Sequence, residues 1–196
     1  MYLITDAYEY LRPGGAVMIP LIFTSLWMWV LIVNRMIYFR RLDRNDVDLK
    51  QAVEMLDRGY APETSNGLRS RLIAGFLKER TGNRKVDLGI LDLCAIRERP
   101  YVTRYLTVIG VLAAIAPLFG LLGTVTGMVT TFEVIALFGT GNAKAMAGGI
   151  SEAMITTQTG LLVAIPGLFM SAFLMRRASG LQRRIDLLVM TLKRRI

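Results

Sequence analysis

Three long uncharged segments stand out in the pattern of apolar and polar positions along the chain. The first apolar run covers residues 16–33, and residues 105–132 and 153–175 carry no charged side chain. A membrane-spanning helix needs about 20 predominantly apolar residues, and each segment meets or approaches that length. The pattern therefore predicts an all-α integral membrane protein with three transmembrane helices that are extended by cytoplasmic helices.

The polar segment of residues 40–104 is predicted to fold into helices of its own. Its first helix has an N-cap at Asn45 or Asp46 and ends at Gly59. Residues 62–67 follow as a turn. The apolar face of this helix consists of three residues at helical spacing: Leu49, Val53 and Leu56.

Two further helices are expected before the second span. One covers Leu68–Arg80 and stops near Gly82-Asn83, and the next begins at Asp87 and passes through Pro100, with a kink into the span. The third span is expected to continue as a helix into the tail, where an apolar stripe recurs at Leu181, Ile185, Leu188 and Leu192.

The basic residues predict how the spans are oriented. They cluster after the first apolar run, before the second span and after the third, whereas the turn of residues 133–152 contains only Lys144 as a basic residue. Cytoplasmic flanks carry the excess of Lys and Arg. The N-terminus is therefore predicted in the periplasm, and residues 40–104 and the tail in the cytoplasm. A cleavable signal peptide is disfavoured, because Asp6 and Glu9 precede the first run and the basic residues follow it.

The composition of the chain limits the kinds of function that it can have. The chain is 53% hydrophobic with a net charge of +9, and charge that flanks membrane spans explains the basic balance better than nucleic-acid binding does. The chain has no histidine, and its one cysteine, Cys94, is expected to be a buried apolar residue. No metal site, cofactor or enzymatic activity is predicted, although a Ser-Lys hydrolase is formally open.

Small residues recur at helical spacing on the second and third spans, which predicts closely packed helices. Candidate packing residues are Gly120, Gly123, Gly127, Gly160 and Pro166. Candidate residues of a polar path are Thr124, Thr156, Thr157 and Glu152. Neither long span contains an acid, and Glu133 and Glu152 lie toward the outer ends. If protons cross here, a partner must supply the carboxylate, because proton transfer usually needs an ionisable group at depth.

Two motifs resemble the MotA/TolQ/ExbB family of proton-channel subunits. GLLGTVTGM of the second span is similar to one family signature, and GISEAMITTQTGLLVAIP of the third span to the other. The three-span plan resembles ExbB and TolQ rather than the four-span MotA, and the sequence around residues 136–153 resembles ExbB most. On this resemblance residues 105–177 form the channel core, between residues 1–39 (N-terminus and first span), 40–104 (cytoplasmic loop) and 178–196 (C-terminal helix).

The resemblance implies a bacterial inner-membrane homopentamer around the single spans of two ExbD-type subunits, each carrying one aspartate. Proton flow through that aspartate would energise a TonB-type protein that reaches the outer membrane. The resemblance places Thr124, Glu152 and Thr157 on the inner face, and it leaves open whether Thr156 or Thr157 faces the aspartate. Two alternatives remain: a TolQ-like subunit of an envelope-integrity complex, and a membrane scaffold that does not conduct.

Overall fold

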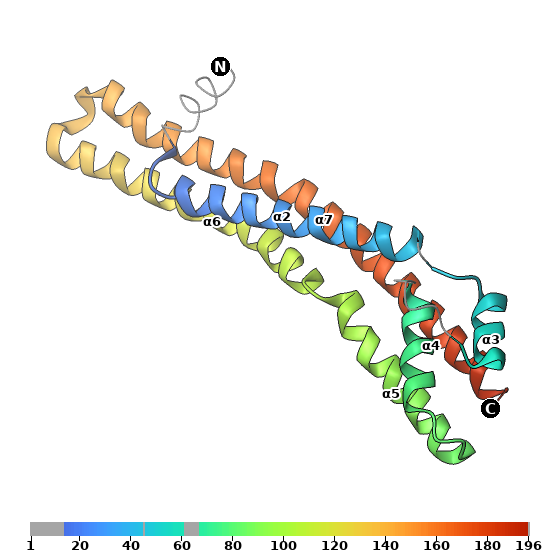
Figure 1. Cartoon of the computed structure of the whole chain (residues 1–196). Helices are drawn as coiled ribbons and strands as arrows, with labels where there is room; N and C mark the ends of the chain where they lie inside the picture. Colours follow the sequence, from blue (N-terminus) through green and yellow to red (C-terminus); the bar gives the residue numbers. More distant parts are fainter. Residues whose placement is uncertain (1–13, 45, 61–66, 196) are drawn as a thin grey trace. The chain divides into compact units, whose positions relative to one another are not determined.

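The computed structural model describes residues 14–44, 46–60 and 67–195, and every regular element in these ranges is helical. The elements are α2 (Met18–Arg44), α3 (Leu49–Arg58), α4 (Leu68–Glu79), α5 (Arg84–Thr103), α6 (Leu106–Phe138), the short 3₁₀ helix η2 (Gly139–Gly141) and α7 (Ala143–Lys193). Figure 1 shows their course.

Three helical stretches of the described chain are long and apolar enough to cross a membrane. They are Met18–Arg44, Arg84–Gly141 and Ala143–Lys193. The prediction of an all-α membrane protein with three spans is therefore confirmed. The predicted cap at Asn45 and the turn of residues 62–66 lie outside the described residues, as does the N-terminal segment of residues 1–13.

The chain divides into two compact units. Unit 1 comprises the chain up to Ile32 together with Val108–Ala172, and unit 2 comprises Val33–Thr107 together with the chain from Phe173 onward. Each unit therefore joins segments that are far apart in the sequence.

In unit 1, small residues lie between α6 and α7, and many large apolar side chains are exposed. Buried residues of α6 and α7 include Ala113, Ala116, Ala153 and Ala164. Large apolar side chains such as Phe23, Leu162 and Phe169 are exposed. This is the packing expected of membrane helices, where small residues let backbones approach and large ones face lipid or a partner.

Unit 2 has an ordinary hydrophobic core. Helix α3 packs on α4, and α4 packs on α5. The predicted stripe on the tail is confirmed, since Leu181, Ile185, Leu188 and Leu192 of α7 are all buried. Cys94 of α5 is also buried, and this burial raises the pKa of its thiol.

Two predicted helix starts are wrong. Helix α3 is capped by Asp48, whose carboxylate accepts a hydrogen bond from the Leu49 amide and which forms a capping box with Gln51. Asp46 instead accepts a hydrogen bond from the Arg69 amide at the start of α4. Because several acidic or amide side chains lie close together before this helix, the sequence alone does not show which one caps it.

Helix α5 begins at Arg84, with Asn83 as its N-cap, rather than at Asp87. Asp87 lies one turn inside the helix, where its carboxylate accepts hydrogen bonds from the Thr81 amide at 2.8 Å and the Gly82 amide at 3.1 Å. The hydrogen bond from the Thr81 backbone is the main reason that the pKa of Asp87 lies below its usual value. Asp87 therefore fixes the turn before α5.

The turn between the second and third spans is much shorter than predicted. Helix α6 continues to Phe138 and α7 starts at Ala143, so most of residues 133–152 are helical. Glu133 bounds the uncharged segment of the second span and Glu152 that of the third, yet both lie inside helices, as does Lys144, because Glu and Lys are good helix formers. Gly139, with φ at 69°, provides the backbone geometry of the turn.

A kink is expected where the loop enters the second span, but the structure has a break in the helix there. Pro100 lies inside α5, and the break falls at Arg104 and Tyr105, where Tyr105 has a φ of 65°. The buried Arg35 of α2 donates a hydrogen bond to the Tyr101 carbonyl at 3.2 Å. Its guanidinium also lies 5.3 Å from the centre of the Tyr105 ring. Arg35 therefore gives the Tyr101 carbonyl, which lies near the break, a hydrogen-bond donor.

Candidate functional site

Helices α6 and α7 of unit 1 run side by side from the η2 turn (Figure 1) and approach each other along glycines. A Cβ atom on Gly120 would lie 3.1 Å from the Thr156 carbonyl oxygen, and one on Gly160 would lie 2.9 Å from the Ala116 carbonyl oxygen. A Cβ on Gly127 would come within 2.8 Å of the Ala153 amide nitrogen. Side chains at these positions would crowd the facing backbone, so the glycines allow the close approach.

Thr156 is part of this packed seam. Its side chain is fully buried, and a Cβ atom on Gly123 would collide with it. Its hydroxyl donates to carbonyl oxygens of its own helix, at 2.9 Å to Glu152 and 3.0 Å to Ala153. Thr156 therefore fills the space that Gly123 leaves and is not accessible from outside the chain.

Thr124 and Thr157 lie instead in an open groove on the surface of α6 and α7. The groove has a volume of about 620 Å³. Both threonines are only half-buried. The remaining lining residues are Met128, Ile150, Ala153, Met154, Gln158 and Leu161. The structure thus brings Thr124 and Thr157 together from two helices and separates both from Thr156.

The hydroxyl hydrogens of the two groove threonines are directed at carbonyl oxygens. The Thr124 hydroxyl donates to the Leu121 carbonyl at 2.6 Å, and the Thr157 hydroxyl donates to the Ala153 carbonyl at 2.9 Å. The Thr157 oxygen is also 3.4 Å from the Gly120 carbonyl oxygen. A hydroxyl oxygen that donates its hydrogen still accepts hydrogen bonds. The threonines therefore offer acceptors to a visiting group.

Glu152 lies away from the groove. Its half-buried side chain packs against Gly15, just before α2, and a Cβ atom on Gly15 would collide with the Glu152 carboxylate. Gly15 has a φ of 66°, so the backbone there also favours glycine. Among the groups that line the groove in the described structure, none is charged.

Gln158 is a groove residue that the sequence reasoning missed. It is exposed and lies next to Thr157 in the lining. It carries the only amide side chain in the uncharged residues 153–175, and that amide is the signal that would have indicated it. Pro166, expected to be a packing residue, lies half-buried inside α7.

Other threonines of the two spans bond back to their own helices. Thr126, Thr130, Thr131 and Thr159 each donate to a carbonyl three or four residues earlier. This is the usual arrangement of threonine in a membrane helix. Since none of the four is a lining residue of the groove, they serve as internal references for Thr124 and Thr157.

Comparison with known proteins agrees with this architecture. The family model of the MotA/TolQ/ExbB proton channel family matches residues 65–186. ExbB-like protein 1 of Synechocystis sp. is 33% identical over 172 residues, which cover 80% of this chain and 65% of that protein. ExbB-like protein 3 of the same organism is 30% identical over 162 residues, covering 78% and 77%. The biopolymer transport protein ExbB of Salmonella typhimurium is 33% identical over 171 residues, covering 76% and 68%.

The chain spans 65% of the length of the first of these relatives, so the similarity does not extend over that whole protein. The family match nevertheless includes all of α6 and the part of α7 that carries the groove. The chain belongs to the MotA/TolQ/ExbB proton channel family, and the relatives described above are named ExbB or ExbB-like.

Proposed function

We propose that the chain is the channel subunit of an ExbB–ExbD inner-membrane motor that uses the proton motive force to energise TonB-dependent transport at the outer membrane. The observation that supports this most directly is the uncharged groove that presents the Thr124 and Thr157 oxygens between apolar walls. The groove has the polarity to receive an acid but contributes no acid of its own.

A proton path through the bilayer usually needs an ionisable group at depth. Residues 105–132 and 153–175 contain none. In this proposal the group is an aspartate on the single span of an ExbD-type subunit, and a homopentamer of the present chain surrounds two such spans. This arrangement is the one that the resemblance to ExbB implies, and it would give each aspartate a series of equivalent grooves.

The two threonines of the groove suit the neutral form of that aspartate. A protonated carboxyl group can donate its hydrogen to the Thr157 oxygen, whereas the threonine hydroxyls direct their own hydrogens at backbone carbonyls and so offer no donor to a carboxylate. The apolar walls add to this preference, because burial away from water raises the pKa of a carboxyl group. The groove would hold the proton-loaded state and release it where water or a cation is available.

In this mechanism Thr157 and Thr124 face the partner, and Thr156 holds α6 and α7 together. Glu152, near the outer end of the third span, is assigned to the proton entrance or to a contact with the partner. An acid there can concentrate protons or pair with a cation without being the carrier at depth.

Substitution of the threonines tests the proposal. Thr157→Val and Thr124→Val keep the shape of the side chain and remove the acceptor oxygen, so we expect loss of growth on a receptor-dependent iron source with normal capture of the ExbD-type partner. Thr159→Val is the matched control, because the Thr159 hydroxyl bonds to the Ile155 carbonyl and lies outside the groove. Normal growth of both groove variants would show that the two hydroxyls are structural only.

A further inference from the structure

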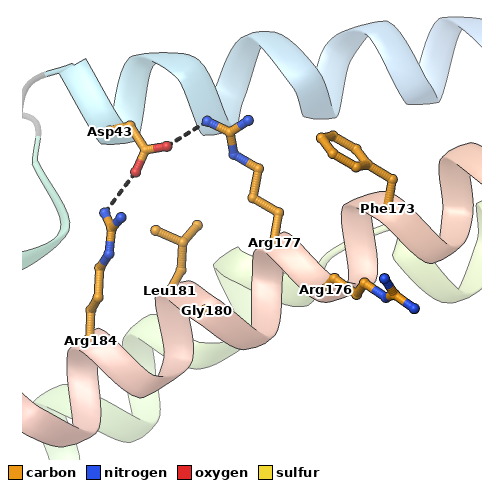
Figure 2. Close-up of a pocket in the computed structure, with 7 residues that line it drawn as sticks. All are labelled: Asp43, Phe173, Arg176, Arg177, Gly180, Leu181 and Arg184. Atoms are coloured by element: carbon orange, nitrogen blue, oxygen red, sulfur yellow. Dashed lines mark hydrogen bonds and ion pairs between the residues drawn. The ribbon is translucent and has the colours of Figure 1, made fainter.

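A second pocket lies in unit 2, where the end of α2 packs beside the part of α7 that follows the third apolar segment. It has a volume of about 550 Å³. Figure 2 shows Arg177 and Arg184 reaching from α7 toward Asp43 of α2. The Arg177–Asp43 distance is 2.6 Å and the Arg184–Asp43 distance is 2.8 Å. Arg176 also lines the pocket, and no ion pair of Arg176 is found within the described chain.

The pocket has more positive charge than its own carboxylate can balance. Three arginines line it with a single acidic residue, Asp43. The guanidinium groups of Arg177 and Arg184 meet that carboxylate, and the guanidinium group of Arg176 is directed away from it (Figure 2). The side chains of Arg177 and Arg184 are 36% and 45% exposed, so both remain reachable from outside. Guanidinium groups bind phosphate oxygens with planar, bidentate geometry. The arrangement therefore suits a phosphate-bearing anion.

The pocket also borders an apolar surface. Phe173 lines it and belongs to the uncharged residues 153–175, whereas Arg176 is the first charged residue after them. Phe173 and Met175 of α7 are each 45% exposed, and Ile37 of α2 is 46% exposed. If α7 spans the bilayer, this boundary lies at the depth of the lipid headgroups, with apolar side chains toward the acyl chains.

We propose that this pocket binds the headgroup phosphate of an anionic glycerophospholipid, with Arg176 as the free contact and Asp43 as an internal competitor for Arg177 and Arg184. Asp43 keeps two of the guanidinium groups paired when the pocket is empty. A lipid phosphate would share or replace those contacts, so the lipid would join the end of α2 to the same part of α7 that Asp43 now connects to it.

Native mass spectrometry of the full-length protein, purified in detergent in its natural assembly, can test this. The probes are phosphatidylglycerol, which is anionic, and phosphatidylcholine, which is zwitterionic. We expect preferential retention of phosphatidylglycerol. Each arginine contact near a membrane surface changes affinity by about fivefold, so Arg176→Gln should lower retention by about that factor. This variant leaves both ion pairs of Asp43 in place and should assemble normally.

Substitution of Asp43 should change lipid retention in the opposite direction from substitution of Arg176. Asp43→Asn removes the internal carboxylate and nearly preserves its shape, so retention of phosphatidylglycerol should rise. A fall or no change in Asp43→Asn would contradict the assignment of Asp43. The double variant Arg176→Gln/Arg184→Gln should retain least. Its matched control is Arg183→Gln/Arg194→Gln, which removes the same charge from exposed positions of the tail outside the pocket.

Three other results would overturn the proposal. Equal retention of the two lipids would exclude recognition of the anionic headgroup. Equal losses in the pocket and control double variants would indicate only general attraction to positive charge. Displacement of the lipid by millimolar inorganic phosphate would identify a site for a soluble anion instead of a lipid. None of these measurements requires proton transport, so they are independent of the channel function.

Discussion

Thr156 and Thr157 are neighbours in the sequence but have different surroundings. Thr156 is fully buried against Gly123, and Thr157 opens into the groove with Thr124. The residue types and their spacing could be recognised from the sequence, because glycine and threonine in uncharged segments are conspicuous. The choice between the two threonines depends on the rotation of α7 against α6, which sequence spacing does not determine to within one residue.

Glu152 allows a prediction at the same scale. Glu152→Gln keeps the side-chain size against Gly15 and removes the charge, so we expect a transport rate several-fold lower but not zero. Glu152→Lys reverses the charge in the same place and should cause a larger loss. Transport rates measured against external pH for both variants provide the test. If Glu152→Gln is as inactive as a complex without the partner aspartate, Glu152 belongs to the central relay instead of the entrance.

At the scale of elements, the seam between α6 and α7 depends on a glycine opposite a threonine. Gly123→Ala would place a methyl group against the Thr156 side chain, and overpacking of this kind costs about 1–3 kcal/mol. We therefore expect a lower melting temperature of the purified assembly.

The double variant Gly123→Ala/Thr156→Gly moves the side chain to the opposite helix and should recover part of the loss. Gly180→Ala is a suitable control on α7, because a Cβ atom there meets no other atom within 4 Å. No recovery in the double variant would mean that this contact does not determine the stability of the seam.

The helices themselves were largely predictable, and their ends were not. Hydrophobic length indicated the three spans, and the apolar stripe indicated that α7 continues into the tail. Three boundaries differed: the Asp48 cap, the Arg84 start and the short turn at η2. Each depends on local competition among polar side chains or on helix propensity beyond the apolar segment. Neither the competition among polar side chains nor the helix propensity can be read from the pattern of charge alone.

At the scale of the whole molecule, the orientation in the membrane is a prediction. We expect the turn at η2 in the periplasm and the start of α5 in the cytoplasm, because basic residues flank the second span on the α5 side. The test uses a Cys94→Ala background with single cysteines at two exposed positions, Lys85→Cys and Thr140→Cys. In intact spheroplasts an impermeant maleimide should label Thr140→Cys and should label Lys85→Cys only after permeabilisation. The opposite pattern would invert the topology.

The partner requirement also belongs to the whole molecule. Residues 105–132 and 153–175 contain no carboxylate. The chain alone should therefore supply hydroxyl oxygens that accept hydrogen bonds, but no ionisable group that carries the proton through the bilayer. Proton current through the complete complex distinguishes a conducting motor from a scaffold, since a scaffold would assemble with the same subunits and carry no current.

The most direct test of this account is proton flux into liposomes that contain the purified chain, with and without the single-span ExbD-type subunit. We predict no flux above background for the chain alone, clear flux for the complex, and loss of that flux when the partner aspartate is replaced by asparagine or when Thr157 is replaced by valine. Equal flux with and without the partner would contradict the central claim, and so would a complete complex that assembles normally and conducts no protons.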